Sequence, residues 1–171
     1  EVLEAVLRQL TGVFNAAGCA ILMAEGDHAD LMVHVPEEEG IKHIANLKID
    51  GDRGILGYMV RERRPLLLHE DDGENFDRFR SFLSSDISSA ISAPLVFKDE
   101  FLGTLLVMGS PRAQQRVERQ YGKGELDLLV TVASQVSQAL AKARLFERSQ
   151  RQVAELSLIN ELGKAINSSL D

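Results

Sequence analysis

The sequence predicts an α+β fold, in which a largely antiparallel sheet of about five to six strands carries helices on both faces. Short apolar runs of strand length alternate with helical patterns along the chain, and two pairs of these runs are joined by hairpin turns. The last part of the chain, from about Gly124 to Asp171, repeats apolar residues at helical spacing almost without interruption. The predicted order is helix, three strands, helix, strand, helix, two strands and a long terminal helix.

The first third of the chain supplies one helix and three strands. Val2–Phe14 places its apolar residues on one helical face. Cys19–Ala24 is apolar at every position, which is typical of a strand buried on both faces. Leu31–Val35 follows across a turn as its hairpin partner, and Ile44–Ile49 is a weaker strand.

The middle of the chain alternates short helices with strands. Ile55–Arg63 is expected to form a short helix, and Leu66–Leu68 a short buried strand. A polar acidic loop then leads into a helix over Phe76–Leu83. Ser88–Phe97 and Phe101–Met108 are the two strongest strand patterns, and the three polar residues between them predict a tight hairpin.

The terminal pattern predicts a helix of roughly 45 residues, about 65 Å long at 1.5 Å rise per residue. Its apolar residues form two sets separated by the polar segment Glu147–Gln152, where we expect a kink or a shift of the packing stripe. The first set is Leu126, Leu129, Ala133, Val136, Leu140 and Ala143, and the second is Val153, Leu156, Ile159, Leu162 and Ile166. We therefore divide the chain into a compact domain over residues 1–147 and a helical connector over residues 148–171.

A domain built from the rest of the chain cannot cover a helix of that length. Either a second copy of the chain or a following domain is expected to pack on its apolar stripe. The absence of an initiator Met and the ending at Ser-Ser-Leu-Asp suggest a piece of a longer protein.

The bulk composition excludes several function classes. The net charge of −7 argues against nucleic-acid binding. No apolar run approaches the roughly 18 residues that span a bilayer, and no signal peptide is visible, so we expect a cytoplasmic protein without membrane insertion. The single cysteine, Cys19, excludes an intrachain disulfide framework. No metal-ligand spacing, nucleophile elbow or phosphate-binding loop is present, so we expect no metal site and no catalytic residues.

Three motifs, taken in order and spacing, resemble those of GAF domains. Gly54-Ile-Leu-Gly57 is similar to the start of the family's short helix. Ser89-Ala-Ile-Ser-Ala-Pro-Leu95 and Phe101-Leu-Gly-Thr-Leu-Leu-Val107 resemble its most recognisable strand pair. Within that pair, Gly103 is expected to let a helix or ligand approach closely, and Pro94 to sit at a bulge or an interruption of pairing. The match covers roughly residues 1–147.

The resemblance implies a regulatory module that senses a small molecule and forms a homodimer through its terminal helices. The final helix resembles the connector of bacterial sensor proteins, which favours a sensor histidine kinase as the parent protein. The alternative is a ligand-free scaffold that serves only dimerisation and transmission. A further alternative is a haem or cyclic-nucleotide sensor.

The family's pocket lies between the sheet and the short helices on one side, so we name as candidate lining residues Met59, Phe79, Phe82 and Ile91. Of the four histidines, His69 at the end of a strand is the best placed as a haem ligand, although a hydrogen-bonded histidine is the ordinary alternative. Cys19 begins a buried strand, which suits a core residue better than a pigment attachment site. The sequence identifies neither the cofactor nor the ligand.

Overall fold

The computed structural model describes residues 2–49, 54–69, 87–109 and 121–169, and its centre is a six-stranded sheet. The spatial order is β3-β2-β1-β6-β5-β4, and every neighbouring pair is antiparallel. The strands are β1 (Gly18–Glu25), β2 (His28–His34), β3 (Lys42–Lys48), β4 (Leu66–His69), β5 (Ser89–Phe97) and β6 (Glu100–Gly109). The predicted α+β class with a largely antiparallel sheet is confirmed.

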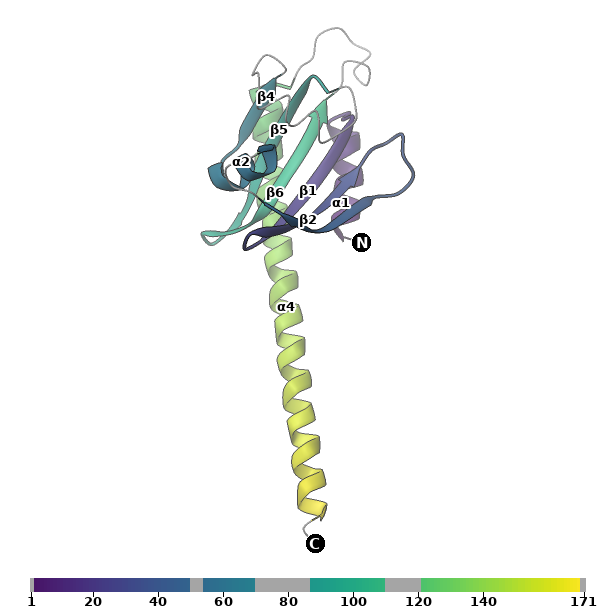
Figure 1. Cartoon of the computed structure of the whole chain (residues 1–171), viewed down its shortest axis with the longest axis vertical. Coiled ribbons are helices and arrows are strands. Elements are labelled where there is room, and N and C mark those ends of the chain that lie inside the picture. The colour runs from purple at the N-terminus through teal and green to yellow at the C-terminus, as the bar shows by residue number, and fades with distance from the viewer. Residues whose placement is uncertain (1, 50–53, 70–86, 110–120, 170–171) are drawn as a thin grey trace.

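Helices cover both faces of this sheet (Figure 1). On one face lie α1 (Val2–Val13) and the first part of α4 (Lys123–Ser169), and on the other lies α2 (Gly54–Glu62). Each face buries its own apolar cluster. The α1/α4 cluster includes Leu7 of α1, and the α2 cluster includes Met59 of α2. The sheet therefore separates two cores, and each strand residue belongs to one of them by its alternation.

The observed elements agree with the predicted ones to within a few residues. The largest difference is β2, which begins at His28 and not at Leu31. The reason is the tight turn, since Glu25 pairs directly with His28 and only Gly26 and Asp27 lie between them. Gly26 has a φ of 64°, which glycine adopts without steric cost. The helix expected at Phe76–Leu83 lies outside the described residues.

The helix α4 is continuous over 47 residues, which corresponds to about 70 Å. Figure 1 shows it leaving the sheet and running straight beyond the domain. Of the two alternatives expected at Glu147–Gln152, a kink or a shift of the packing stripe, the kink is wrong, because the segment is helical throughout and carries no proline or glycine to break it. What changes along α4 is the exposure of its apolar side chains: Leu129 is 0% exposed, whereas Leu145 is 60% exposed.

Gly103 allows a close approach, but the approaching group is a neighbouring strand and not the expected helix or ligand. A Cβ at this position would lie 1.9 Å from the carbonyl oxygen of Leu22 on β1. Pro94 pairs in register with Thr104, and the β5–β6 pairing shifts only between Leu95 and Val96. The bulge therefore lies beyond Pro94, and the expectation that this proline itself sits at a bulge or an interruption of pairing is wrong.

Tyr121 ties the start of α4 to the rest of the domain. Its hydroxyl donates a hydrogen bond of 3.0 Å to the carbonyl oxygen of Phe14, just after α1. Its backbone N–H donates to the hydroxyl of Ser89 on β5 at 3.2 Å. The Tyr121 and Phe14 rings also pack edge to face, with centroids 6.2 Å apart. The ends of α1 and the beginning of α4 are therefore held together by one side chain.

Candidate functional site

The α2 face of the sheet is the candidate sensing face, because a short helix packs there over an apolar floor. Met59 is a buried residue of α2, with 2% of its surface exposed. It packs among residues from all strands except β3. The buried members of this cluster are Ala20, Leu22, Ala29, Leu31, Val33, Met59, Leu66, Leu68, Ile87, Ala90, Leu106 and Met108.

The apolar face of the sheet under α2 also carries two buried hydroxyl groups. Thr104 of β6 pairs with Leu22, and Ser92 of β5 pairs with Leu106, so both share the face of the α2 cluster. They are 2% and 1% exposed. Among the described residues, the Thr104 hydroxyl oxygen has no hydrogen-bond partner. An unsatisfied buried hydroxyl costs about 1–3 kcal/mol, so a group that pairs with it would be favoured.

The sequence analysis did not select Thr104 or Ser92. The available signal was their polarity inside otherwise apolar strand patterns, at positions that alternate with Leu105 and Ile91 on the opposite face. Met59, which was selected, does lie on the α2 face.

Two other selected residues lie on the opposite face. Ile91 belongs to the α1/α4 cluster with Leu129, so it cannot line a pocket together with Met59. The error arises from a strand buried on both sides, where apolarity does not reveal the face. His69 pairs with Ser89, whose hydroxyl accepts the backbone N–H of Tyr121, so His69 also lies on the α4 side. The other two selected residues, Phe79 and Phe82, lie outside the described residues.

A buried polar group links α1 to the sheet at Cys19 and His34. These two residues are cross-strand neighbours on β1 and β2. Nδ1 of His34 lies 2.9 Å from the hydroxyl of Thr11, which donates to the carbonyl oxygen of Leu7 at 2.8 Å. Burial raises the pKa of the Cys19 thiol to about 12, so this cysteine is an unreactive core residue. Burial, and then the nearby Arg8, lower the pKa of His34.

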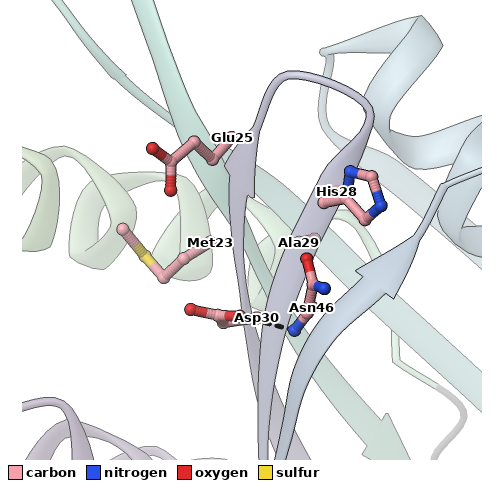
Figure 2. Close-up of a pocket in the computed structure, with 6 residues that line it drawn as sticks. All are labelled: Met23, Glu25, His28, Ala29, Asp30 and Asn46. Carbon is pink, nitrogen blue, oxygen red and sulfur yellow. Dashed lines mark hydrogen bonds between the residues drawn. The ribbon is translucent and has the colours of Figure 1, made fainter.

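A small polar pocket opens beside the β1–β2 hairpin, with a volume of about 230 Å³. Figure 2 shows Met23, Glu25 and Asp30 on the side of the hairpin where α4 lies. The Asp30 carboxylate accepts the backbone N–H of Asn46 at 2.9 Å. Met23 packs against the α1/α4 cluster and Ala29 belongs to the α2 cluster, so the pocket is lined by residues of both clusters at the β1–β2 hairpin.

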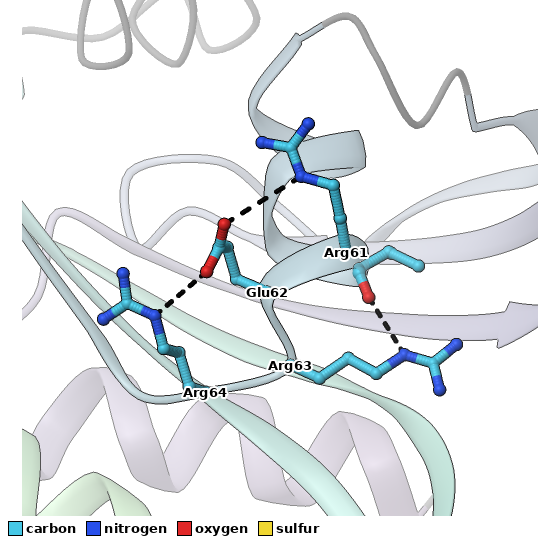
Figure 3. A network of polar contacts seen from close by, with 5 residues as sticks. Arg61, Glu62, Arg63 and Arg64 are labelled. Carbon is cyan, nitrogen blue, oxygen red and sulfur yellow. Dashed lines mark hydrogen bonds and ion pairs between the residues drawn. The ribbon is translucent and has the colours of Figure 1, made fainter.

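The end of α2 carries three arginines, and two of them contact the carboxylate of Glu62 (Figure 3). Nε of Arg64 donates to the Glu62 carboxylate at 3.1 Å, and Nε of Arg61 lies 3.9 Å from its other oxygen. Nε of Arg63 donates to the carbonyl oxygen of Val60 at 3.1 Å. Cationic side chains suit the end of a helix, where carbonyl groups point outward. This cluster therefore has an ordinary structural explanation.

The described residues offer no grouping of three or more His, Cys, Asp or Glu side chains that could hold a metal ion. None of the helices that the structure describes is long and apolar enough to cross a membrane.

Comparison with known proteins identifies the class to which this fold belongs. The family model for the GAF domain matches residues 1–140, so the chain belongs to the GAF family. This is a family of regulatory and sensory domains of signalling proteins. A search of curated proteins found no match.

Solved structures support the same fold at low sequence identity. The GAF domain of a phosphoenolpyruvate-protein phosphotransferase from Acinetobacter has a TM-score of 0.62 at 18% identity, covering 84% of this chain and 82% of that one. The second GAF domain of DevS from Mycobacterium smegmatis has a TM-score of 0.62 at 17% identity, with coverages of 86% and 96%. The blue-light-absorbing PixJ GAF domain of Thermosynechococcus elongatus has a TM-score of 0.60 at 15% identity, with coverages of 86% and 88%.

Proposed function

We propose that this chain is a non-catalytic sensory domain that binds a small molecule and forms a homodimer through its terminal helices. In this proposal it belongs to a cytoplasmic sensor histidine kinase of a bacterium, and α4 connects it to the next domain. Binding would act by favouring one of two arrangements of the helices, which requires different ligand affinities for the two.

The observation that carries this proposal is the exposed second half of α4. Beyond the domain, its large apolar side chains are between half and two thirds exposed. They are Leu145 60%, Phe146 64%, Val153 63%, Leu156 62%, Leu158 57%, Ile159 62%, Leu162 54% and Ile166 59%. At 3.6 residues per turn, four of them lie within about 120° of one another and form an exposed apolar stripe: Leu156, Ile159, Leu162 and Ile166. An exposed apolar surface of this kind marks an interaction site in a soluble protein. A second copy offers an identical helix with the same pattern, so the two can cover each other.

The geometry of α4 separates this surface from the domain's own core. At 3.6 residues per turn, the set from Leu156 to Ile166 is rotated by roughly 100° from the set that includes Leu129 and Ala133. The first set contacts the sheet, while the second points in another direction. This rotation allows one straight helix to pack on its own domain and then on a partner.

A deletion tests the proposal. Ending the chain after Phe146 removes the exposed apolar residues from Val153 to Ile166, keeps Leu145 and Phe146, and leaves the buried contacts of Leu129 and Ala133 in place. Sedimentation equilibrium should show a dimer for the full chain and a dissociation constant at least tenfold higher for the shortened one. An unchanged dissociation constant, or a full chain that stays monomeric at high concentration, would contradict the dimer.

The ligand-free scaffold remains a second candidate, favoured by one observation. The α2 cluster is already close-packed, with Leu22, Met59 and Leu106 each no more than 3% exposed. Native mass spectrometry of the purified protein separates the two candidates. A retained mass of a few hundred daltons supports sensing, whereas a clean mass of the chain alone after reconstitution with cell extract favours the scaffold.

The haem and cyclic-nucleotide alternatives receive less support. His34 uses Nδ1 against Thr11, and His69 lies on the α4 side of the sheet. Cyclic-nucleotide-binding GAF domains carry an Asn-Lys…Phe…Asp-Glu signature. In this chain the Phe, Lys, Asp and Glu residues of Phe97–Glu100 have a different spacing and close the β5–β6 hairpin. An absorption band near the Soret region in protein loaded with haem would restore the haem alternative.

A further inference from the structure

The β5–β6 hairpin contacts helices on both faces of the sheet. Glu100 pairs in register with Phe97, which packs against the α1/α4 cluster, so both share the α4 face. Phe101 follows Glu100 and pairs with Val96, and therefore points to the α2 face. Successive residues of one strand thus contact different helices.

A bulge makes this arrangement possible. Val96 pairs with Phe101 and Leu95 pairs with Gly103, so Leu102 is an extra residue on β6. Leu102 is 1% exposed and belongs to the α1/α4 cluster, as do Leu95 and Leu105. The bulge changes the alternation and directs Phe101 toward α2.

The contact on the α2 side comes from Arg63, the residue that follows α2. Its guanidinium carbon lies 4.6 Å from the centre of the Phe101 ring, which is a cation–π geometry. Its backbone has a φ of 49°, and its N–H donates to the carbonyl oxygen of Met59 at 3.1 Å. A non-glycine residue in this conformation is strained. Arg63 thus connects the buried Met59 of α2 to the hairpin.

The contact on the α4 side comes from Arg144, which lies 4.0 Å from the Glu100 carboxylate. This is the last turn of α4 that still contacts the domain: Ala141 is 8% exposed, and Leu145 is already 60% exposed. The hairpin therefore touches α4 where the helix leaves the sheet.

We propose that the β5–β6 hairpin mechanically couples α2 to α4. A displacement of the end of α2 moves Phe101 through Arg63, and Glu100 then shifts α4 at Arg144. This inference rests on the proposed sensory function, for which it supplies the route from the sensing face to the connector. The two anchors lie at adjacent residues of one short strand segment, so neither can move far without the other.

Amide hydrogen exchange of the full chain, without any ligand, tests this coupling. Arg63→Ala should raise the exchange rate in the α4 segment over residues 140–147 by about two- to fivefold, the factor that a surface cation–π contact corresponds to. Arg63→Gly should do the same, and because glycine adopts the left-handed backbone freely, it removes the side chain without adding strain. The matched control is Arg61→Ala, whose guanidinium lies over the Tyr58 ring on α2 itself.

Coupling is reciprocal, so the opposite substitution provides a second readout. Arg144→Ala should raise exchange in the last turn of α2 by a similar factor. The inference is overturned if exchange in α4 stays at the wild-type rate in both Arg63 variants while exchange in α2 rises. It is equally overturned if Arg61→Ala raises exchange in α4 as much as Arg63→Ala does. Because neither a ligand nor a dimer is required, failure here is distinguishable from failure of the proposed function.

Discussion

Gly103→Ala should destabilise the domain strongly, because the added Cβ meets backbone atoms and not a movable side chain. It would lie 1.9 Å from the carbonyl oxygen of Leu22, 3.0 Å from its carbonyl carbon and 3.2 Å from Cα of Met23. Real Cβ contacts stay above 3.0 Å, so β1 and β6 would have to separate by about 1 Å. A separation of that size breaks the adjoining ladder hydrogen bonds, whose normal length is about 2.9 Å.

The expected loss is about 3–6 kcal/mol, corresponding to two or three hydrogen bonds at about 1 kcal/mol each plus about 1–3 kcal/mol of overpacking. Urea unfolding followed by circular dichroism measures this difference. Gly12→Ala is the matched control: nothing lies within 4 Å of its Cβ, and it sits inside α1, so it should stabilise by about 0.5–1 kcal/mol. If Gly103→Ala unfolds within about 0.5 kcal/mol of the wild type, the argument from strand contact is refuted.

Two further substitutions test the contacts that hold α1 and the residue after it to the rest of the domain. Tyr121→Phe removes the hydrogen bond to the Phe14 carbonyl and should reduce the free energy of unfolding by about 1 kcal/mol in urea; no loss would mean that the hydroxyl contributes nothing. Burial lowers the pKa of His34, so the unfolded chain binds more protons below about pH 6.5 and stability should fall there. His34→Gln should flatten the decline between about pH 6.5 and 5, and an equally steep decline in both proteins would assign it to other groups.

The periodicity of the sequence predicted the fold because most elements carry a strong local signal. The β5 and β6 patterns, joined by three polar residues, predicted a hairpin from local sequence alone. The sequence left open whether α4 kinks or shifts its packing stripe at Glu147–Gln152. The helix does not kink, since a polar surface segment does not interrupt backbone hydrogen bonding. The apolar side of the helix changes direction across this segment, while the path of the helix stays straight.

The candidate site was less predictable because its residues depend on which face of a strand they occupy. Strands buried on both sides are apolar throughout, so Ile91 could be assigned to either face. The bulge at Leu102 reverses the alternation near the start of β6, and no local signal marks it. The contact of Arg63 with Phe101 depends on this bulge, and therefore only the structure reveals it.

Disulfide trapping between two copies tests the central claim, that the second half of α4 is the interface of a homodimer. Ile159→Cys places a thiol on the apolar stripe, and Glu161→Cys places one about 200° around the same helix. The native Cys19 is 0% exposed with a raised pKa, so it does not need to be removed. Under mild oxidation Ile159→Cys should form a covalent dimer quickly and Glu161→Cys should not. Equal trapping of both variants, or of neither, would contradict the account.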